Sequence, residues 1–198
     1  MQDEIEIRTN KSRTETTRAA LMEAARVLFS QKGYAETSTP EIVKAAGVTR
    51  GALYHHFEGK EAVFRAVVTQ EYMAVADEIN DSTESALGST IDALKQGGRA
   101  YLRAMNKPGR VRILLLDGPA VLGQIELNRI DRETSADTLR VGLTQAIKAG
   151  EIRNLPINAL TTQLSAMFDR AALAVSEGEN PDDHKQVLDA LLTTLKEG

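Results

Sequence analysis

The chain contains no cysteine, so it has no disulfide bonds and no thiolate metal sites. Its three histidines, His55, His56 and His184, show no paired spacing for a metal ion. The chain also lacks a nucleophile elbow and a glycine loop of the kind that holds phosphate. The sequence therefore indicates no metal site, no cofactor and no catalytic residues, and an enzyme is the less favoured class of protein.

No apolar run approaches the length of a membrane span, although 42% of the 198 residues are hydrophobic. The first residues, MQDEIEIRTN, are acidic and lack the basic and then apolar layout of a secretory signal. A chain of this length can bury a substantial core, as one domain or as a small domain joined to a larger one. We therefore expect a cytoplasmic protein.

The formal net charge is −4, but the charges are unevenly distributed along the chain. From Lys11 to Lys60 there are eight Lys or Arg residues and five Glu residues, which gives this segment +3 and leaves −7 for the remainder. The phosphate backbone of nucleic acids attracts positive charge. Only the amino-terminal segment therefore has the sign that nucleic-acid binding requires.

Capping and turn residues divide the segment Thr37–Lys60, TSTPEIVKAAGVTRGALYHHFEGK, into two short helices. The hydroxyl group of Ser38 or Thr39 can cap the first helix. With Ser38 as the cap, Glu41 three residues later completes a capping box. Gly47 supplies the left-handed conformation that ends this helix.

The second helix has Thr49 as its cap and runs from about Arg50 to His56. Leu53 and Phe57 are four residues apart and share one face, while polar side chains project elsewhere. A helix of about two turns is unstable alone in water. Neighbouring helices must therefore hold it in place.

The order of these anchors, caps and turn residues resembles the DNA-binding domain of the TetR family of transcriptional regulators. The resemblance covers roughly residues 12 to 65, and it is more specific than a bare pair of helices, since helical hairpins are common structural units. The rest of the chain resembles the family only in outline, although LLLDGPAVLG at 114–123 is similar to the effector domains of many such regulators. The residues that carry the resemblance are Thr37, Ile42, Ala46-Gly47-Val48, Leu53-Tyr54, His56-Phe57 and Lys60-Glu61.

The resemblance implies that the second short helix enters the major groove of DNA, with its first turns against base edges. The planar fork of Arg50 would pair with a guanine, while Thr49 and Tyr54 would reach phosphates or a thymine methyl group. Gly51 leaves room for the backbone to approach, and His55 is a further base or phosphate contact. The expected DNA-binding residues are Ser38, Thr39, Thr49, Arg50, Gly51, Tyr54, His55 and Lys60.

Lys60 begins a helix, where its charge opposes the helix dipole unless an anion lies nearby. The resemblance makes a DNA phosphate the natural anion, and a solvated lysine is the alternative. For the two short helices as a whole, the alternative is a structural hairpin whose exposed polar residues bind nothing.

The hydrophobic pattern is helical along the rest of the chain, which predicts an all-α protein. A long helix begins at Lys60, and further helices are expected over 90–105 and 120–149, after Pro156 and after Asn180-Pro181. We therefore divide the chain as follows: a mobile arm (1–11), a three-helix DNA-binding domain (12–60), a connecting helix (61–83), and an effector-binding and dimerisation domain (84–198).

Three details between these helices are expected from composition. The apolar run Val111–Leu116 fits a strand or a buried helix, and we choose helix because no partner strand is found. Gly97-Gly98 within a helix indicates a kink or a close helix approach. Asp117-Gly118-Pro119 is expected to form a turn.

The last two helices carry wide aliphatic stripes, which fits two helices from each subunit of a homodimer. An internal core also accounts for such stripes, and the resemblance to a dimeric family favours the dimer. Because helical bundles often hold ligands, a small-molecule effector is expected there, with Gln163 or Asp169 as a polar anchor. The expected ligand-binding residues, each of which also fits an ordinary core, are Tyr101, Met105, Leu115, Gln163, Met167 and Phe168.

The sequence thus favours a homodimeric transcriptional repressor that a small molecule releases from a palindromic DNA operator. The alternative is a helical protein-interaction module that does not bind DNA. The two hypotheses differ in their prediction for Arg50→Ala, which would weaken DNA binding only in the first.

Overall fold

The computed structural model describes residues 2–83, 88–134 and 138–196, with side chains described from Arg13 onward. Within these ranges the chain forms helices, and its strand pairing is limited to an isolated bridge between Ile152 and Lys196. The predicted all-α fold is therefore confirmed. None of the described helices combines the length and the apolar character that a membrane crossing needs. The elements are α1 (Gln2–Lys32), α2 (Thr39–Ala45), α3 (Arg50–His56), α4 (Lys60–Thr83), α5 (Thr90–Met105), the π-helix η1 (Arg112–Asp117), α6 (Gly118–Leu122), α7 (Gln124–Thr134), α8 (Thr138–Lys148), α9 (Ile157–Ser176) and α10 (Pro181–Thr193).

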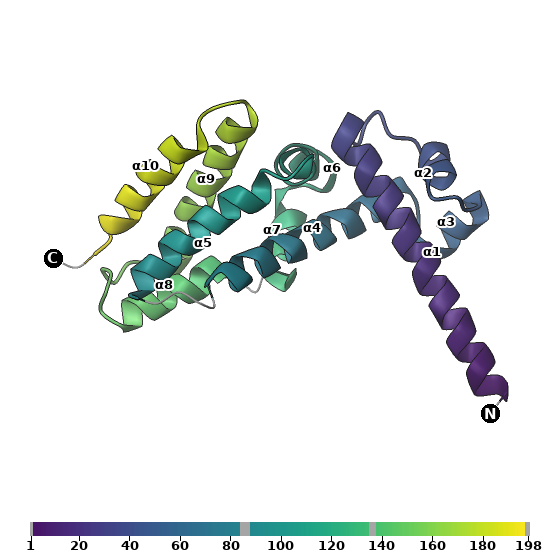
Figure 1. Ribbon diagram of the computed structural model, residues 1–198, viewed down its shortest axis with the longest axis horizontal. Coiled ribbons are helices and arrows are strands. Elements are labelled where there is room, and N and C mark those ends of the chain that lie inside the picture. The colour runs from purple at the N-terminus through teal and green to yellow at the C-terminus, as the bar shows by residue number, and fades with distance from the viewer. Residues whose placement is uncertain (1, 84–87, 135–137, 197–198) are drawn as a thin grey trace.

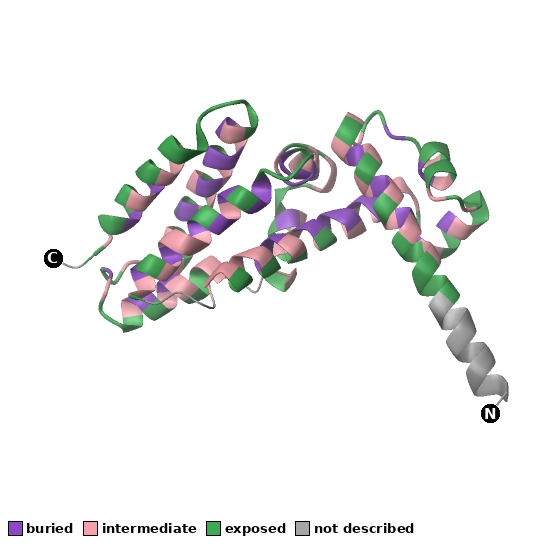
Figure 2. Cartoon of the chain, viewed as in Figure 1, coloured by how far each residue is buried: buried purple, intermediate pink, exposed green. Residues whose placement is uncertain are grey.

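Helix α4 connects two groups of helices. Helices α1, α2 and α3 gather at one end of the molecule, while α5, α8, α9 and α10 form a bundle at the other (Figure 1). One face of α4 is buried along most of its length, in both groups (Figure 2). The long helix expected from Lys60 is therefore present and contributes to both cores.

The amino-terminal group packs around three aromatic rings. The ring centroids of Phe29 and Phe64 are 5.1 Å apart in an edge-to-face arrangement, and those of Tyr34 and Phe64 are 5.0 Å apart. Gly33, with a φ of 84°, ends α1 as predicted and lets Tyr34 fold back onto Phe29. These contacts hold the end of α1 against the start of α4.

The first helix is longer than expected. We predicted a mobile arm over residues 1–11, whereas α1 begins at Gln2, and residue 1 lies outside the described residues. No glycine or proline occurs before Gly33, so no residue in this stretch interrupts the helix. The helix therefore extends into the predicted arm from Gln2 onward, and the mobility of this arm stays a prediction.

The two glycines of α5 allow a close helix approach, one of the two outcomes predicted for them. A Cβ atom added to Gly98 would lie 2.6 Å from Cε1 of Phe168 in α9. The neighbouring Gly97 faces α4, where its nearest contact would be an ordinary 3.6 Å to Ile79. Only Gly98 therefore requires the absence of a side chain for the packing of α5 against α9.

The turn expected at Asp117-Gly118-Pro119 is absent. The chain instead passes directly from η1 into α6, and Gly118 has helical dihedral angles of −53° and −58°. Pro119 lies in the first turn of α6, and its fixed φ is compatible with a helix. Gly123, with a φ of 78°, ends this helix instead. The choice of helix over strand for the preceding apolar run is confirmed.

The boundary expected between the two parts of the chain is only partly described. Helix α4 ends at Thr83 and α5 begins at Thr90, while residues 84–87 lie outside the described residues. The Ser89 hydroxyl accepts a hydrogen bond from the Asp92 N–H at 3.3 Å, which caps α5.

Candidate nucleic-acid interface

Helix α3 is short but firmly anchored. The Thr49 hydroxyl accepts a hydrogen bond from the Ala52 backbone N–H at 3.2 Å, as predicted for the cap. Leu53 is fully buried, and Phe57, the residue after the helix, is 6% exposed. Gly47 has a φ of 65°, which allows the turn after α2. The predicted pair of short helices joined by a turn is therefore confirmed.

Helix α2 is fixed by the predicted pair of Ser38 and Glu41. The Ser38 N–H and hydroxyl both donate to Glu41 Oε2, at 2.9 Å and 2.7 Å. Lys32 of α1 also forms an ion pair with Glu41. The hydrogen bond from Lys32, followed by those from Ser38, lowers the pKa of Glu41 to about 2. This carboxylate therefore stabilises the start of α2 and joins it to α1.

The exposed side of α3 carries most of the predicted DNA-binding residues. We refer to Thr49, Arg50, Gly51, Tyr54 and His55 as the reading face, and all five residues are exposed. The Arg50 guanidinium carbon lies 5.5 Å from the centroid of the Tyr54 ring, within the range of a cation–π contact. The structure therefore brings a cation, an aromatic ring, an imidazole and a hydroxyl together on one surface.

Ser38 and Thr39 lie at the start of α2, where Ser38 is exposed and Thr39 is half-buried. A further exposed cation, Lys44 on α2, is absent from the predicted set. Its signal in the sequence is only the positive charge of the segment that contains it. Arg18 on α1, which was expected from the sequence to reach phosphate, is exposed as well.

Lys60 directs its charge into the protein. Its Nζ donates to the carbonyl oxygens of Tyr34 and Thr37, each at 2.9 Å, and lies 4.0 Å from the centroid of the Tyr34 ring. These groups compensate the positive charge of Lys60 at the start of a helix. From the sequence, a DNA phosphate or solvent was expected to provide this compensation. A phosphate contact by Lys60 stays a prediction, and its present contacts hold the loop between α1 and α2.

The two adjacent histidines differ in their surroundings. His55 is exposed, whereas His56 is half-buried. Burial, the neighbouring His55 and Arg18 all lower the pKa of His56. His56 therefore favours its neutral form, and His55 is better placed to reach a ligand.

A cavity of about 1160 Å³ lies among α4, α5, α7, α8 and α9. Four predicted ligand-binding residues line it: Tyr101, Met105, Leu115 and Phe168. Gln163 and Met167 do not border this cavity, and ligand binding by any of the six residues stays a prediction. The lining residues of α9 recur at helical spacing, and both Gln163 and Met167 fall outside that register. The lining residues of α9 are Asn158, Thr161, Thr162, Ser165, Ala166, Phe168 and Asp169.

Asp169, the alternative polar anchor, does line the cavity. Its Oδ1 accepts a hydrogen bond from the Tyr101 hydroxyl at 2.5 Å. Burial raises the pKa of Asp169, the bond from Tyr101 opposes this effect, and the nearby Asp131 raises the pKa further. Burial and Asp169 likewise raise the pKa of Tyr101 well above its ordinary value. The cavity thus contains a carboxylate in surroundings that disfavour its charge.

A buried ion network joins α1, α4 and the segment before η1. Glu71, 4% exposed, accepts from Arg26 Nε at 2.5 Å and from Arg110 Nε at 2.6 Å. Arg110, 3% exposed, also donates to Glu78 at 2.9 Å and to the Ala104 carbonyl at 2.8 Å. Charges this deeply buried require such partners. The network therefore ties the amino-terminal helices to the bundle.

The π-helix η1 forms a second connection between the two groups. The Tyr34 backbone N–H donates to Asp117 Oδ2 at 2.8 Å, and Arg112 donates to the Gln31 carbonyl at 3.3 Å. Within the same π-helix, Leu114-Leu115 lines the cavity. One element therefore contacts both the end of α1 and the cavity wall.

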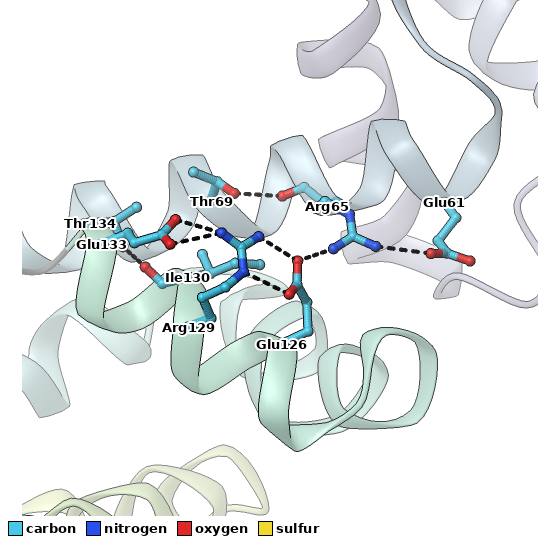
Figure 3. Close-up of polar contacts among 8 residues, drawn as sticks. All are labelled: Glu61, Arg65, Thr69, Glu126, Arg129, Ile130, Glu133 and Thr134. Carbon is cyan, nitrogen blue, oxygen red and sulfur yellow. Dashed lines mark hydrogen bonds and ion pairs between the residues drawn. The ribbon is translucent and has the colours of Figure 1, made fainter.

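A row of surface charges joins α4 to α7 (Figure 3). Glu126 accepts from Arg65 of α4 and from Arg129 of its own helix. Arg65 also pairs with Glu61 at 3.1 Å, and Arg129 pairs with Glu133 at 2.7 Å. The hydrogen bond from Arg129 is the largest cause that lowers the pKa of Glu126 to about 2. Exposed pairs contribute little stability individually, so this row mainly orients α7 on α4.

Comparisons with known sequences match two separate parts of the chain. Residues 21–67 match the sequence model of bacterial regulatory proteins of the tetR family, and residues 91–198 match that of the tetracyclin repressor-like C-terminal domain. The HTH-type transcriptional repressor AcnR of Corynebacterium glutamicum is 24% identical over 187 residues, which cover 91% of this chain and 93% of AcnR.

Two solved structures share the fold. A TetR-family transcriptional regulator from Pectobacterium atrosepticum is 31% identical, with a TM-score of 0.72, over 93% of this chain and 94% of that one. The structure of RolR in complex with resorcinol is 18% identical, with a TM-score of 0.71, over 94% and 90% of the two chains. The match to the C-terminal family model alone spans more than half of the chain. The chain therefore belongs to the TetR family of helix-turn-helix transcriptional regulators, which are not enzymes.

Proposed function

We propose that the protein is a homodimeric repressor, which binds a palindromic operator through the reading face and leaves it when a small molecule enters the cavity. One observation carries this proposal. The reading face exposes Arg50, Tyr54 and His55 on a helix whose opposite side, at Leu53, is fully buried. Side chains on such an anchored helix can reach base edges without loss of the surrounding structure.

The role of Arg50 follows from its chemistry. A guanidinium fork matches the two acceptors of guanine in the major groove, and one such pair provides about 1–3 kcal/mol of discrimination. The Tyr54 ring beside it limits the conformations of Arg50 before DNA is bound. Lys60 acts indirectly in this proposal, because it positions the loop before α2.

Dimerisation through α9 and α10 is the second part of the proposal. Val187 and Leu191 are 57% and 41% exposed and lie four residues apart on one face of α10. A second copy of the chain would cover this aliphatic face in a four-helix arrangement. A two-fold axis there would present two reading faces, and one DNA turn of about 34 Å separates the half-sites that such dimers bind.

The proposed switch depends on α4, η1 and the cavity. Residues of α4 border the cavity, while the first turns of the same helix pack against α1. A ligand that repositions α4 or η1 would therefore change the spacing of the reading faces. A coupling free energy of about 1–3 kcal/mol, or 5- to 150-fold in affinity, suffices for such a response. AcnR is named a repressor, and RolR was solved with resorcinol, which supports both parts of this proposal by analogy.

The experiment is selection from a pool of short DNA duplexes, followed by a binding titration from about 50 to 200 mM salt. The wild-type protein is expected to enrich a palindrome, and Arg50→Ala is expected to lose that preference. Arg103→Ala is the matched control, because Arg103 is an exposed arginine of α5 outside the reading face.

Equal and weak binding by all three proteins at every salt concentration would overturn the proposal. That result would favour the helical interaction module. Sedimentation of the free protein tests dimerisation separately, with Leu191→Glu expected to shift the protein toward the monomer. A wild-type protein that sediments as a monomer at micromolar concentration would contradict the dimer.

A further inference from the structure

The aromatic residues of the bundle are concentrated around its cavity. Beyond Phe64 the chain has three aromatic residues, Tyr72, Tyr101 and Phe168, and all three line the cavity. They come from three different helices, α4, α5 and α9, and the Tyr101 and Phe168 rings lie 6.0 Å apart at an angle of 63°. The packing of an ordinary core does not require that all the aromatic rings of the bundle lie around one large space. The walls therefore offer π surfaces to whatever occupies the cavity.

A carboxylate lies among these rings. Asp169 accepts the hydrogen bond from Tyr101, and it forms no ion pair with any residue that the structure describes. The charge of Asp131, which has the same sign, raises the pKa of Asp169 further. A carboxylate removed from water is costly unless a positive group compensates it. A cation bound in the cavity would supply this compensation.

We propose that the cavity binds a lipophilic organic cation, with Asp169 as its counter-ion and the rings of Tyr72, Tyr101 and Phe168 around its charged group. A cation over an aromatic ring contributes about 0.5–2 kcal/mol, more when water is excluded. The apolar side of the ligand would contact aliphatic residues such as Leu94, Met105 and Leu114, which also line the cavity. A cavity of about 1160 Å³ accommodates a molecule of several rings.

Two arginines also border the cavity and define the competing ligand class. Arg132 and Arg140 are exposed, so they lie toward solvent rather than beside the three rings. An anionic ligand would bind near these two residues. The net charge of −7 outside residues 11–60 favours attraction of a cation over an anion. The role of the cation as effector rests on the proposed function, whereas its binding does not.

The test uses two probe ions of nearly the same shape and opposite charge, tetraphenylphosphonium and tetraphenylborate. Calorimetric titration of the full chain, without DNA and in sodium buffer, is expected to show at least tenfold tighter binding of tetraphenylphosphonium. Asp169→Asn is expected to weaken tetraphenylphosphonium binding at least tenfold without weakening tetraphenylborate binding. Asp77→Asn removes the same charge from an exposed site on α4, and its affinity is expected to equal that of the wild type.

The asparagine of the Asp169→Asn variant keeps an oxygen that can accept the Tyr101 hydrogen bond, so the substitution retains the shape of the site. Should this variant unfold, the comparison of the two ions on the wild-type protein still decides the question. Equal or tighter binding of tetraphenylborate overturns the proposal, as does unchanged tetraphenylphosphonium binding by folded Asp169→Asn.

The effector role is tested on the operator complex. Tetraphenylphosphonium that binds the protein but leaves the complex intact overturns the effector role and supports the cation site. Operator binding without any tetraphenylphosphonium binding overturns the cation site and leaves the proposed function in place.

Discussion

Replacement of Arg110 by methionine tests the buried network that joins the two groups of helices. Methionine retains an apolar stem of similar length but removes the guanidinium group. The change removes the hydrogen bonds to Glu71 at 2.6 Å, Glu78 at 2.9 Å and the Ala104 carbonyl at 2.8 Å. Glu71, which is only 4% exposed, then keeps Arg26 as its one described cation.

The expected cost follows from the burial of both partners. Removal of one member of a buried ion pair costs about 3–5 kcal/mol, because the other charge stays buried without full compensation. For a chain of this length, each kcal/mol lowers the midpoint of thermal unfolding by about 2–4 °C. We therefore expect Arg110→Met to lower the melting temperature by about 6–20 °C. Circular dichroism during heating and in urea measures both quantities.

The matched control is Arg103→Met, which removes an exposed arginine of α5 and should change stability by less than about 0.5 kcal/mol. The double variant Glu71→Gln with Arg110→Met should cost less than the sum of its single variants, because it leaves no uncompensated carboxylate at Glu71. The reasoning is refuted if Arg110→Met costs less than about 1 kcal/mol, the contribution of an exposed pair.

Three further predictions follow from the packing, the cap and the surface charges. Gly98→Ala should destabilise the protein by about 1–3 kcal/mol in thermal melts, because the added Cβ would meet Phe168. Gly97→Ala should be neutral or stabilising. Equal effects of the two substitutions would contradict the described packing. Thr49→Ala should cost about 1 kcal/mol in urea denaturation and Thr49→Ser should not, since serine keeps the cap. The pKa of Glu126 is lowered to about 2, so its charged carboxylate stabilises the fold at pH values above the ordinary carboxyl pKa. This stabilisation should be lost as the pH falls through about 2. Its carboxyl resonance followed by NMR should titrate near that pH, and a midpoint near 4 would contradict the ion pairs.

The end of α1 and the starts of α2 and α3 were predictable, because each depends on residues close in sequence. The Ser38–Glu41 pair, the Thr49 cap and the glycine at position 33 each involve contacts within four residues. Asn180 caps α10 in the same way, through a hydrogen bond from the Asp182 N–H at 3.1 Å. Such local rules fail where two elements compete, as at Gly118-Pro119, where helical continuation replaced the expected turn.

The cavity was predictable only in part. Helical spacing places residues on a common side of a helix, but it does not say which side faces a neighbouring helix and which faces a space. Phe168 and Tyr101 were expected to line a space inside the bundle, and both line the cavity. Gln163 was chosen as a polar anchor by type alone, and α9 directs it outward, while Asp169 occupies the position that the helix directs inward.

The connection between the two groups of helices left no local signal. Arginine and glutamate are almost always exposed unless they are paired, so Glu71 and Arg110 read as surface residues in the sequence. Their pairing joins positions 39 residues apart, and the hydrogen bond from Tyr34 to Asp117 spans 83 residues. Apolar residues fill the core of each group, where a substitution of similar volume is tolerated. The polar contacts between the groups have no such tolerance, because each depends on one donor and one acceptor at a fixed distance. Substitutions at these contacts should therefore change the position of the reading face relative to the cavity more than they change the structure of either site.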